Sequence, residues 1–191
     1  MRADNVLENV YVIDDFLPDP LKVRQSGLSA HYINWLGPDK QVYKRISHVI
    51  IPDVTDILTD IFKNVDLLGM AFRLNYAGEL PNVPIHSDIG WGSHALVIFL
   101  SEGSSGTTFW QHKKTGATRI SPGEIDLLDQ IDGDWDKLDC WKSRLHIEMK
   151  FNRAIIYSSN LFHSRYPFDA FGNCPDNGRL ILVAFFTPGS I

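Results

Sequence analysis

The sequence is poor in cysteine and in long apolar runs, and each shortage excludes a class of protein. Two cysteines occur among 191 residues. Cys140 and Cys174 lie far apart in no metal-type spacing, so neither a disulfide framework nor a zinc site is expected. No apolar run approaches the roughly 18 to 20 residues that span a bilayer. The first residues, MRADNVLENV, lack the apolar segment of a signal peptide. We therefore expect a cytoplasmic protein with no membrane partner.

Charge of one sign is also scarce. The formal charge is -5, and no block of like charges occurs, which argues against a surface that follows a phosphate backbone. A hydrophobic content of 44% with 21% charged residues is typical of a folded protein rather than a disordered chain. A chain of 191 residues normally forms one domain around one core. We therefore expect a single domain over 1–191 and no nucleic-acid partner.

The N-terminal part, residues 1–68, shows short strand patterns and two helix patterns. The run NVYVIDDFLPDP is β-branched and aromatic and closes with Asp and Pro, which predicts a strand that ends in a turn. Its Asp19, followed directly by proline, is typical of the N-cap of a helix. This helix is expected to end near Ala30, and a further strand is predicted over residues 42–51.

A second helix is predicted after Pro52, with Asp53 as its cap and one apolar face. The residues of that face recur at helical spacing and are Val54, Ile57, Leu58, Ile61, Phe62 and Val65. Both helices precede the strand-rich part of the chain, so they are available to cover one of its sheets.

From about residue 69 to 187 the pattern changes to short strands separated by Gly, Pro, Asn and Ser clusters. The predicted strands are 70–77, 93–101, 107–112, 153–159 and 179–187. This pattern is typical of an antiparallel barrel or jelly roll, so we expect a mainly β fold with flanking helices. The last strand, RLILVAFF, is apolar on both faces and should be central. The charged, partly helical stretch at about 111–150 is interpreted as an insertion over the barrel mouth.

His86 and Asp88 are the central chemical signal. Residues i and i+2 of an extended chain point to the same face about 6 to 7 Å apart, so this imidazole and this carboxylate can bind one ion. A third ligand from a distant strand would complete the 2-His-1-carboxylate triad of oxygen-activating Fe(II) sites. His163 is the best candidate. The His-x-Asp spacing alone is weak evidence, and a hydrogen-bonded pair in a turn is the alternative.

Arg179 opens the strongly apolar last strand. A buried arginine with no acidic neighbour in sequence needs an anion, and its planar guanidinium suits a carboxylate. Arg165, two residues after His163, is a competing candidate in a loop-like context. An ordinary salt bridge from Arg179 to Asp169 or Asp176 is the structural alternative.

The order of these residues resembles a known superfamily. Tyr76, the His-x-Asp pair, GTTFW, NRAIIYSSNLFHSRYP and Arg179 follow one another as in the 2-oxoglutarate and Fe(II)-dependent oxygenases. Within that superfamily the order is similar to the prolyl-hydroxylase-like branch. The resemblance runs from about residue 70 to residue 187, and the ordered set is more specific than any single element.

The resemblance implies a double-stranded β-helix with the site between its sheets. It also implies that His86, Asp88 and His163 bind Fe(II), that 2-oxoglutarate chelates the metal, and that Arg179 holds its far carboxylate. Tyr76 resembles the tyrosine that lines the family's co-substrate pocket. A second polar group for the co-substrate is left open among three residues, which are Asn75, Ser93 and Thr108.

The implied activity is a dioxygenase that hydroxylates a C–H bond, with dioxygen and a small molecule or peptide as partners. Halogenating relatives lack the carboxylate, so Asp88 argues against halogenation. The substrate is open between an amino acid, a peptidyl residue and a small metabolite, and Trp91 is either a wall of its pocket or an exposed loop residue. Two alternatives remain. A non-catalytic β-helix module would have a damaged triad, and a cupin-like oxygenase without 2-oxoglutarate would have no convergent arginine.

Overall fold

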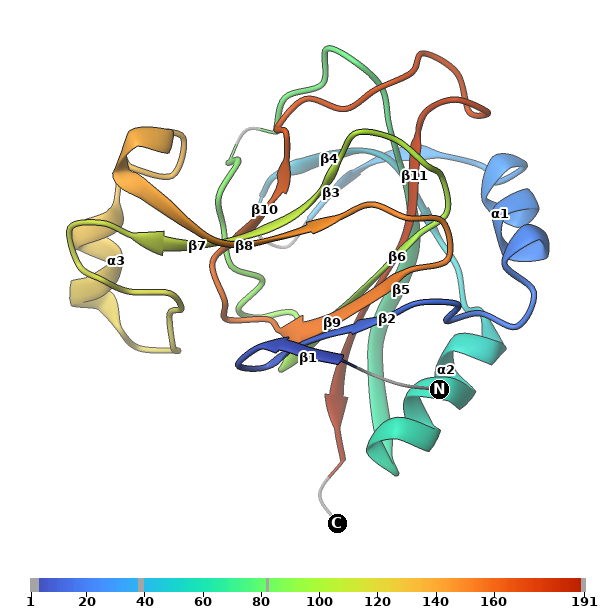
Figure 1. Ribbon diagram of the computed structural model, residues 1–191, viewed down its shortest axis with the longest axis horizontal. Helices are drawn as coiled ribbons and strands as arrows, with labels where there is room; N and C mark the ends of the chain where they lie inside the picture. Colours follow the sequence, from blue (N-terminus) through green and yellow to red (C-terminus); the bar gives the residue numbers. More distant parts are fainter. Residues whose placement is uncertain (1–3, 38–39, 82, 190–191) are drawn as a thin grey trace.

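Two antiparallel sheets face each other in the computed structural model, which describes residues 4–37, 40–81 and 83–189 (Figure 1). The larger sheet has the order β1-β2-β9-β6-β11-β5-β4-β3. Its strands are β1 (Asp4–Leu7), β2 (Val10–Ile13), β3 (Ile33–Leu36), β4 (Val42–His48), β5 (Val65–Asn75), β6 (His94–Phe99), β9 (Ala154–Ser158) and β11 (Arg179–Pro188). The smaller sheet has the order β10-β7-β8. Its strands are β7 (Gly106–His112), β8 (Trp141–Glu148) and β10 (His163–Tyr166).

The segment at His86 extends the smaller sheet by an isolated antiparallel bridge to His163. The N–H of His86 donates to the carbonyl of His163 at 3.0 Å, and the N–H of His163 donates to the carbonyl of His86 at 2.9 Å. From β5 onward the chain passes back and forth between the two facing sheets, with β7 and β8 paired in the smaller one, and this arrangement is a double-stranded β-helix, or jelly roll. The expected fold class, mainly β with flanking helices, is confirmed.

Helices α1 (Pro20–Leu28) and α2 (Pro52–Phe62) cover the outer face of the larger sheet (Figure 1). Asp19 caps α1 as expected, because its carboxylate accepts the N–H of Lys22 at 3.1 Å. The prediction for α2 is wrong at both ends. Ile51 is its N-cap and Asp53 lies inside the first turn without capping it, whereas Val65 already belongs to β5. None of the helices in the described part of the chain is long and apolar enough to cross a membrane.

β11 is the central strand that its apolar sequence predicts, because it pairs with β5 on one side and β6 on the other. Successive side chains of a strand point to opposite faces. The even-numbered residues of β11 therefore pack under the two helices, and these are Leu180, Leu182, Ala184 and Phe186. Ile181, Val183 and Phe185 face the smaller sheet. The space between the sheets on this second side contains the candidate site.

The interpretation of residues 111–150 as an insertion over the barrel mouth is wrong. Its last part is β8, which pairs with β7 along its length. β8 lies at the edge of the smaller sheet with only Trp141 and Ile147 buried, so its exposed charged side chains hide the strand pattern. The middle part contains α3 (Ile125–Ile131) and the short helical turn η1 (Leu138–Cys140), which extend beyond the ends of β7 and β8 (Figure 1).

This middle part packs behind the predicted metal ligands rather than over them. Ile131 and Trp141 form a buried cluster with Ile85 and Phe162, the residues that precede His86 and His163 in sequence. The N–H of Ile85 also donates to the carbonyl of Trp135 at 3.2 Å. The segment therefore supports both ligand-bearing backbones from the side opposite the cavity.

Candidate metal centre and cavity

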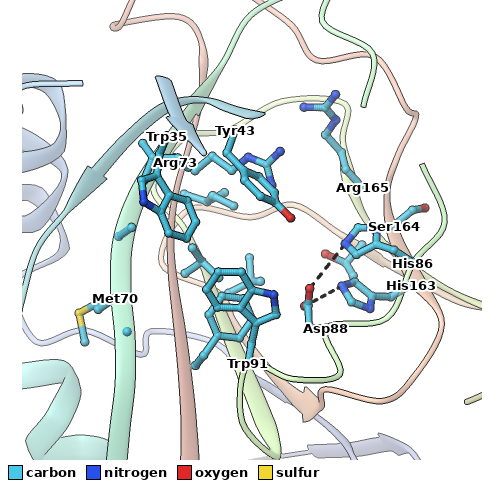
Figure 2. Close-up of a pocket in the computed structure, with 18 of the residues that line it drawn as sticks. Trp35, Tyr43, Met70, Arg73, His86, Asp88, Trp91, His163, Ser164 and Arg165 are labelled. Atoms are coloured by element: carbon cyan, nitrogen blue, oxygen red, sulfur yellow. Dashed lines mark ion pairs between the residues drawn. The ribbon is translucent and has the colours of Figure 1, made fainter. Parts of the chain in front are cut away.

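Three predicted ligands, His86, Asp88 and His163, converge in space (Figure 2). One donor atom from each lies within 4.8 Å of the others. The Nε2 atom of His163 is 3.2 Å from Oδ2 of Asp88, and the Nε2 atom of His86 is 3.8 Å from Oδ1. The bridge between the two histidine backbones brings a loop and a strand together, and the extended His-x-Asp segment adds the carboxylate.

Backbone carbonyls orient both imidazole rings. The Nδ1 atom of His163 lies 2.9 Å from the carbonyl oxygen of Leu161, and that of His86 lies 3.1 Å from the carbonyl oxygen of Pro84. A carbonyl oxygen only accepts hydrogen bonds, so each Nδ1 carries the proton in the neutral ring. Both Nε2 lone pairs are therefore left toward Asp88. Metal-binding histidines are oriented in this way in proteins.

The charges of the three groups are coupled. Burial, together with the nearby His163, lowers the pKa of His86 to about 4. Burial alone would raise the pKa of Asp88, but the two imidazoles and Arg73 lower it overall. For His163 burial acts downward, yet the carboxylate of Asp88 raises the pKa. At neutral pH His86 is therefore neutral and Asp88 is ionised, as metal ligands need to be, whereas His163 gives up its proton when a metal binds.

The triad opens on a cavity of about 160 Å³ between the two sheets, called here the main cavity. An adjoining side cavity, lined by residues 41–44, 79–81 and 83 among others, shares the triad's His86 and Asp88 with it. The main cavity is lined largely by aromatic and aliphatic side chains and by three arginines, which are Arg73, Arg165 and Arg179.

Arg179 is buried at the start of β11 and lines the main cavity. Its Nε atom lies 3.3 Å from the hydroxyl oxygen of Ser105, and no acidic side chain of the described residues contacts it. The salt bridges considered from the sequence are not formed, because a carboxylate oxygen of Asp169 accepts the N–H of Gly78 instead. Burial, with Arg165 and Arg73 nearby, lowers the pKa of Arg179 well below its usual value. A buried guanidinium in this setting requires an anion.

Arg165 lines the same cavity, but its guanidinium donates hydrogen bonds to backbone carbonyls. Its Nε donates to the carbonyl of Phe168 at 3.0 Å, and its Nη2 donates to the carbonyl of Glu79 at 2.6 Å. These bonds hold two loops together and leave less of this guanidinium for a ligand. Arg165, the competing candidate for the anchor, therefore lies in the cavity, but its guanidinium has a structural role.

Tyr76 is not brought to either cavity. It follows β5 with the parity of Leu74, so it packs against the core on the helix-covered side of the sheet. The guanidinium of Arg45 lies 4.3 Å above its ring. The tyrosine near the triad is Tyr157 on β9, whose hydroxyl is 3.1 Å from Nε2 of His163. Burial, followed by the charge of Asp88, raises the pKa of Tyr157 well above its usual value, so this hydroxyl remains a donor.

Sequence reasoning assigned no role to Tyr157, although the segment that contains it was part of the resemblance. The available signal was its position on a predicted strand that leads into His163. Of the three residues left open for a second polar group, Asn75 lines the side cavity, and its Oδ1 is buried without a hydrogen-bond partner among the described residues. Ser93 bonds to His94 and Thr108 to His146 instead.

Arg73 on β5 is a second residue that sequence reasoning missed. It faces both cavities, and its Nε is buried without a hydrogen-bond partner in the described part of the chain. Its guanidinium lies 5.4 Å from the centre of the Tyr43 ring. The available signal was an arginine inside an otherwise apolar strand, AFRLNY, the same feature that pointed to Arg179.

Aromatic side chains close the other end of the main cavity (Figure 2). Trp91 stacks on Phe185 with ring centres 5.3 Å apart, and Trp35 lies 5.5 Å from Trp91. His48 meets the Trp35 ring edge-on at 5.0 Å. Trp91 was interpreted either as a wall of the substrate pocket or as an exposed loop residue, and the structure supports the first interpretation.

Several solved structures are similar to this fold. AviO1 from Streptomyces viridochromogenes Tue57 has a TM-score of 0.57 at 13% sequence identity, with 96% of this chain and 91% of that chain covered. The non-heme α-ketoglutarate-dependent carbocyclase SnoK from nogalamycin biosynthesis also has a TM-score of 0.57, at 11% identity, covering 93% and 79%. EctD from S. alaskensis with bound Fe has a TM-score of 0.52 at 13% identity, covering 93% and 72%.

At these identities the likeness shows the fold alone. No protein-family model matches the sequence, and the search of curated proteins found no match. The chain therefore has the fold of non-heme iron and α-ketoglutarate-dependent enzymes, and its chemistry must be argued from its own residues.

Proposed function

We propose that this protein is an Fe(II)- and 2-oxoglutarate-dependent dioxygenase that hydroxylates a C–H bond of its substrate. The observation that carries the proposal is the convergence of His86, Asp88 and His163, with both Nε2 atoms turned to the carboxylate, beside a cavity that also contains the buried Arg179. Two of the similar structures are described as α-ketoglutarate-dependent or iron-bound, which supports the same class.

His86, Asp88 and His163 fit Fe(II) as a ligand set. Two imidazole nitrogens and one carboxylate oxygen on one side of an ion form the triad typical of non-heme Fe(II) oxygenases, with the remaining positions open. These open positions would face the main cavity, where a co-substrate and dioxygen have access. When bound, the iron and 2-oxoglutarate supply the oxidising chemistry, which consumes dioxygen, releases succinate and carbon dioxide, and hydroxylates a substrate C–H bond.

Arg179 is proposed to hold the far carboxylate of 2-oxoglutarate. Its guanidinium has one hydrogen bond to a neutral hydroxyl and no acidic partner among the described residues, so its charge is available to a dicarboxylate. Asn75 is its direct partner across the β5–β11 ladder, and the N–H group of its side-chain amide can donate to a carboxylate. Asn75 is therefore our choice for the second polar group.

Tyr157 would act as a neutral donor at the metal site. Its hydroxyl points at the ligand nitrogen of His163. A metal ion on that nitrogen takes its lone pair, and the hydroxyl is then available to donate to another acceptor in the cavity. The apolar walls around it limit the entry of water and strengthen the interactions of the charged groups.

Both alternative functions lose support. A non-catalytic module predicts a damaged triad, but the three ligands are intact and oriented. A cupin-like enzyme without 2-oxoglutarate predicts no convergent arginine, yet Arg179 lines the same cavity as the triad. Assignment to the prolyl-hydroxylase-like branch, hydroxylation as the outcome and a cytoplasmic location remain predictions from the sequence.

The test is an anaerobic titration of the Fe(II)-loaded protein with 2-oxoglutarate, followed by visible spectroscopy. We expect the weak charge-transfer band of the Fe(II)–2-oxoglutarate chelate to grow with saturation. The same protein loaded with Zn(II) is the matched control and should show no band. If iron is bound and no band forms, the 2-oxoglutarate assignment is wrong and the alternative functions gain weight.

A further inference from the structure

Arg73 is a half-buried cation with no ion-pair partner among the described residues. Its Nε has no hydrogen-bond partner and no acidic group of the described residues lies within ion-pair distance of its guanidinium. Its guanidinium lies over the face of the Tyr43 ring, 5.4 Å from the ring centre. The carboxylate of Asp88 acts on it only through space. The Nε atom is nevertheless buried without a partner inside a cavity, so an anionic ligand is the simplest reason for its presence.

The charges around the main cavity leave Arg73 without a partner even after the co-substrate is bound. Arg165 donates to backbone carbonyls, and Arg179 is assigned to 2-oxoglutarate. Among the described residues that line the main cavity, Asp88 is the only carboxylate, and it serves the metal. Glu79 in the side cavity is paired with Arg45. The guanidinium of Arg73 therefore remains for an anion other than Asp88 and 2-oxoglutarate.

A slot for an apolar group leads away from Arg73. Ala71 and Gly69 precede Arg73 at two-residue intervals on the same face of β5, and both line the main cavity. A Cβ atom built on Gly69 would have no heavy atom within 4 Å, which identifies open space there. Trp91 and Phe185 stack beside this space. The cavity therefore combines a cationic end with an aromatic-walled, apolar end.

The positions of these groups relative to the triad fit a substrate site. Figure 2 shows Arg73 and Tyr43 on one side of the opening and the triad on the other, with Trp91 between them below. A molecule held at Arg73 would pass in front of the open side of the metal site. Its apolar part would then present C–H bonds there.

We propose that Arg73 binds the carboxylate of the substrate, and that the substrate is a carboxylic acid with an apolar body lying along Ala71 and Gly69. This inference rests on the proposed function, because it takes Arg179 as the anchor of 2-oxoglutarate. Carboxylates and phosphates can both bind one edge of a guanidinium, but a carboxylate carries a single charge, which one guanidinium balances. A buried phosphate would require several donors, and among the described residues that line the main cavity Arg73 is the one unassigned arginine or lysine.

The proposal narrows the substrate classes considered from the sequence. A small carboxylic acid satisfies Arg73, whereas the interior of a peptide brings an apolar side chain without a carboxylate. The proposed ligand needs no second site on the surface, because the main cavity offers Arg73 for its carboxylate and apolar walls for its body.

The test compares acids with their neutral amides on the Fe(II)- and 2-oxoglutarate-loaded protein under anaerobic conditions. The probes are phenylacetate and hexanoate, with phenylacetamide and hexanamide, measured by isothermal titration calorimetry. We expect at least one acid to bind about tenfold or more tightly than its amide, as for a hydrogen bond to a charged group. Arg73→Gln should remove this preference. Arg144→Gln, at an exposed arginine of β8, should retain it.

A second variant separates charge from shape. Arg73→Lys keeps the cation but loses the two-pronged edge, so it should retain only part of the preference. The charge-transfer band and the 2-oxoglutarate half-saturation are recorded for every variant. Equal binding of acids and amides to the wild type would overturn the proposal, as would a Gln variant that loses 2-oxoglutarate affinity rather than acid affinity.

Failure of the proposed function is visible separately in the same samples. If the band forms but the acids show no preference, only the assignment of Arg73 fails. If the band never forms on the iron-loaded protein, the 2-oxoglutarate assignment fails first, and the inference that depends on it fails with it.

Discussion

The two faces of the β5–β11 pair differ in composition although the same two strands supply both. The face under α1 and α2 is apolar at the core positions, which are Met70, Phe72, Leu74, Leu180, Leu182, Ala184 and Phe186. The face toward the smaller sheet contains Arg73, Asn75 and Arg179 among its apolar residues. Each strand therefore alternates between residues that stabilise the fold and residues that face a ligand.

The difference has an energetic meaning. Burial of one large apolar side chain contributes about 1.5 to 3 kcal/mol, so the helix-covered face stabilises the molecule. The cavity face holds the buried Arg179 and the half-buried Arg73, neither with an acidic partner among the described residues, and an amide oxygen without a donor, which costs stability. We infer that the helix-covered face mainly supplies stability and the cavity face mainly supplies activity. Three substitutions test this division, and a fourth, on neither face, is the reference.

Asp88→Ala should have the largest effect, and the effect should be on activity. Loss of a ligand should reduce Fe(II)-dependent succinate formation by at least about a thousandfold, since partners that only orient a ligand already cost about 10- to 100-fold. The metal-free variant should keep the wild-type circular dichroism spectrum. Near-wild-type succinate formation would remove Asp88 from the site.

Leu182→Ala should have the next largest effect, and it should be on stability. Leu182 is fully buried under the helices, so truncation should lower the free energy of unfolding by about 2 to 5 kcal/mol. Urea denaturation measures this loss. Val183→Ala, one residue away on the half-buried cavity face, is the matched control and should cost clearly less. Equal costs would break the distinction between the two faces.

Arg179→Ala should raise the 2-oxoglutarate concentration at half-saturation by about 10- to 100-fold, the value of one lost charged hydrogen-bonding group. Arg165→Ala should change it far less, because that guanidinium is engaged by backbone carbonyls. The charge-transfer titration measures both variants. The reverse order would mean that Arg165 is the anchor.

Asp14→Asn, which lies on neither face, should have the smallest effect. Hydrogen bonds from Arg153 and then Lys150 lower the pKa of Asp14 from 3.8 to about 2. The ionised carboxylate therefore contributes stability above pH 4, and this contribution is lost as the pH falls toward 2. The carboxylate is 37% exposed, so we expect a loss below about 1 kcal/mol at pH 7. Urea denaturation at pH 7 and pH 3 measures it, and an equal loss at both would contradict the assignment.

Much of the fold follows from local pattern. The apolar strand that begins at Arg179 and the Asp19 cap rest on neighbouring residues and were confirmed. The apolar face of α2 was confirmed for Val54, Ile57, Leu58 and Phe62, whereas Ile61 is exposed and Val65 belongs to β5. β8 was missed because an edge strand with one solvated face carries charges that resemble a surface loop. Its strand character depends on pairing with β7, a contact between residues distant in sequence.

The candidate site divides in the same way. His86, Asp88 and His163 were found because two of them share one face of an extended segment and the third follows a strand, and a metal site needs those residue types. Tyr76 was expected in the pocket, but it lies one strand position out of phase with Arg73 and Asn75. A shift of one residue moves a side chain to the opposite face of a sheet.

Residue patterns, together with the resemblance of their order to a known superfamily, thus predicted a β-rich fold, two histidines and a carboxylate that could hold a metal, and a buried arginine. Only the tertiary structure decided which face of β5 looks into the cavity, which tyrosine approaches His163, and that Arg73 has no ion-pair partner among the described residues. The physical reason is that side-chain periodicity is local, whereas the side of a sheet that is left open depends on which helices and strands cover it.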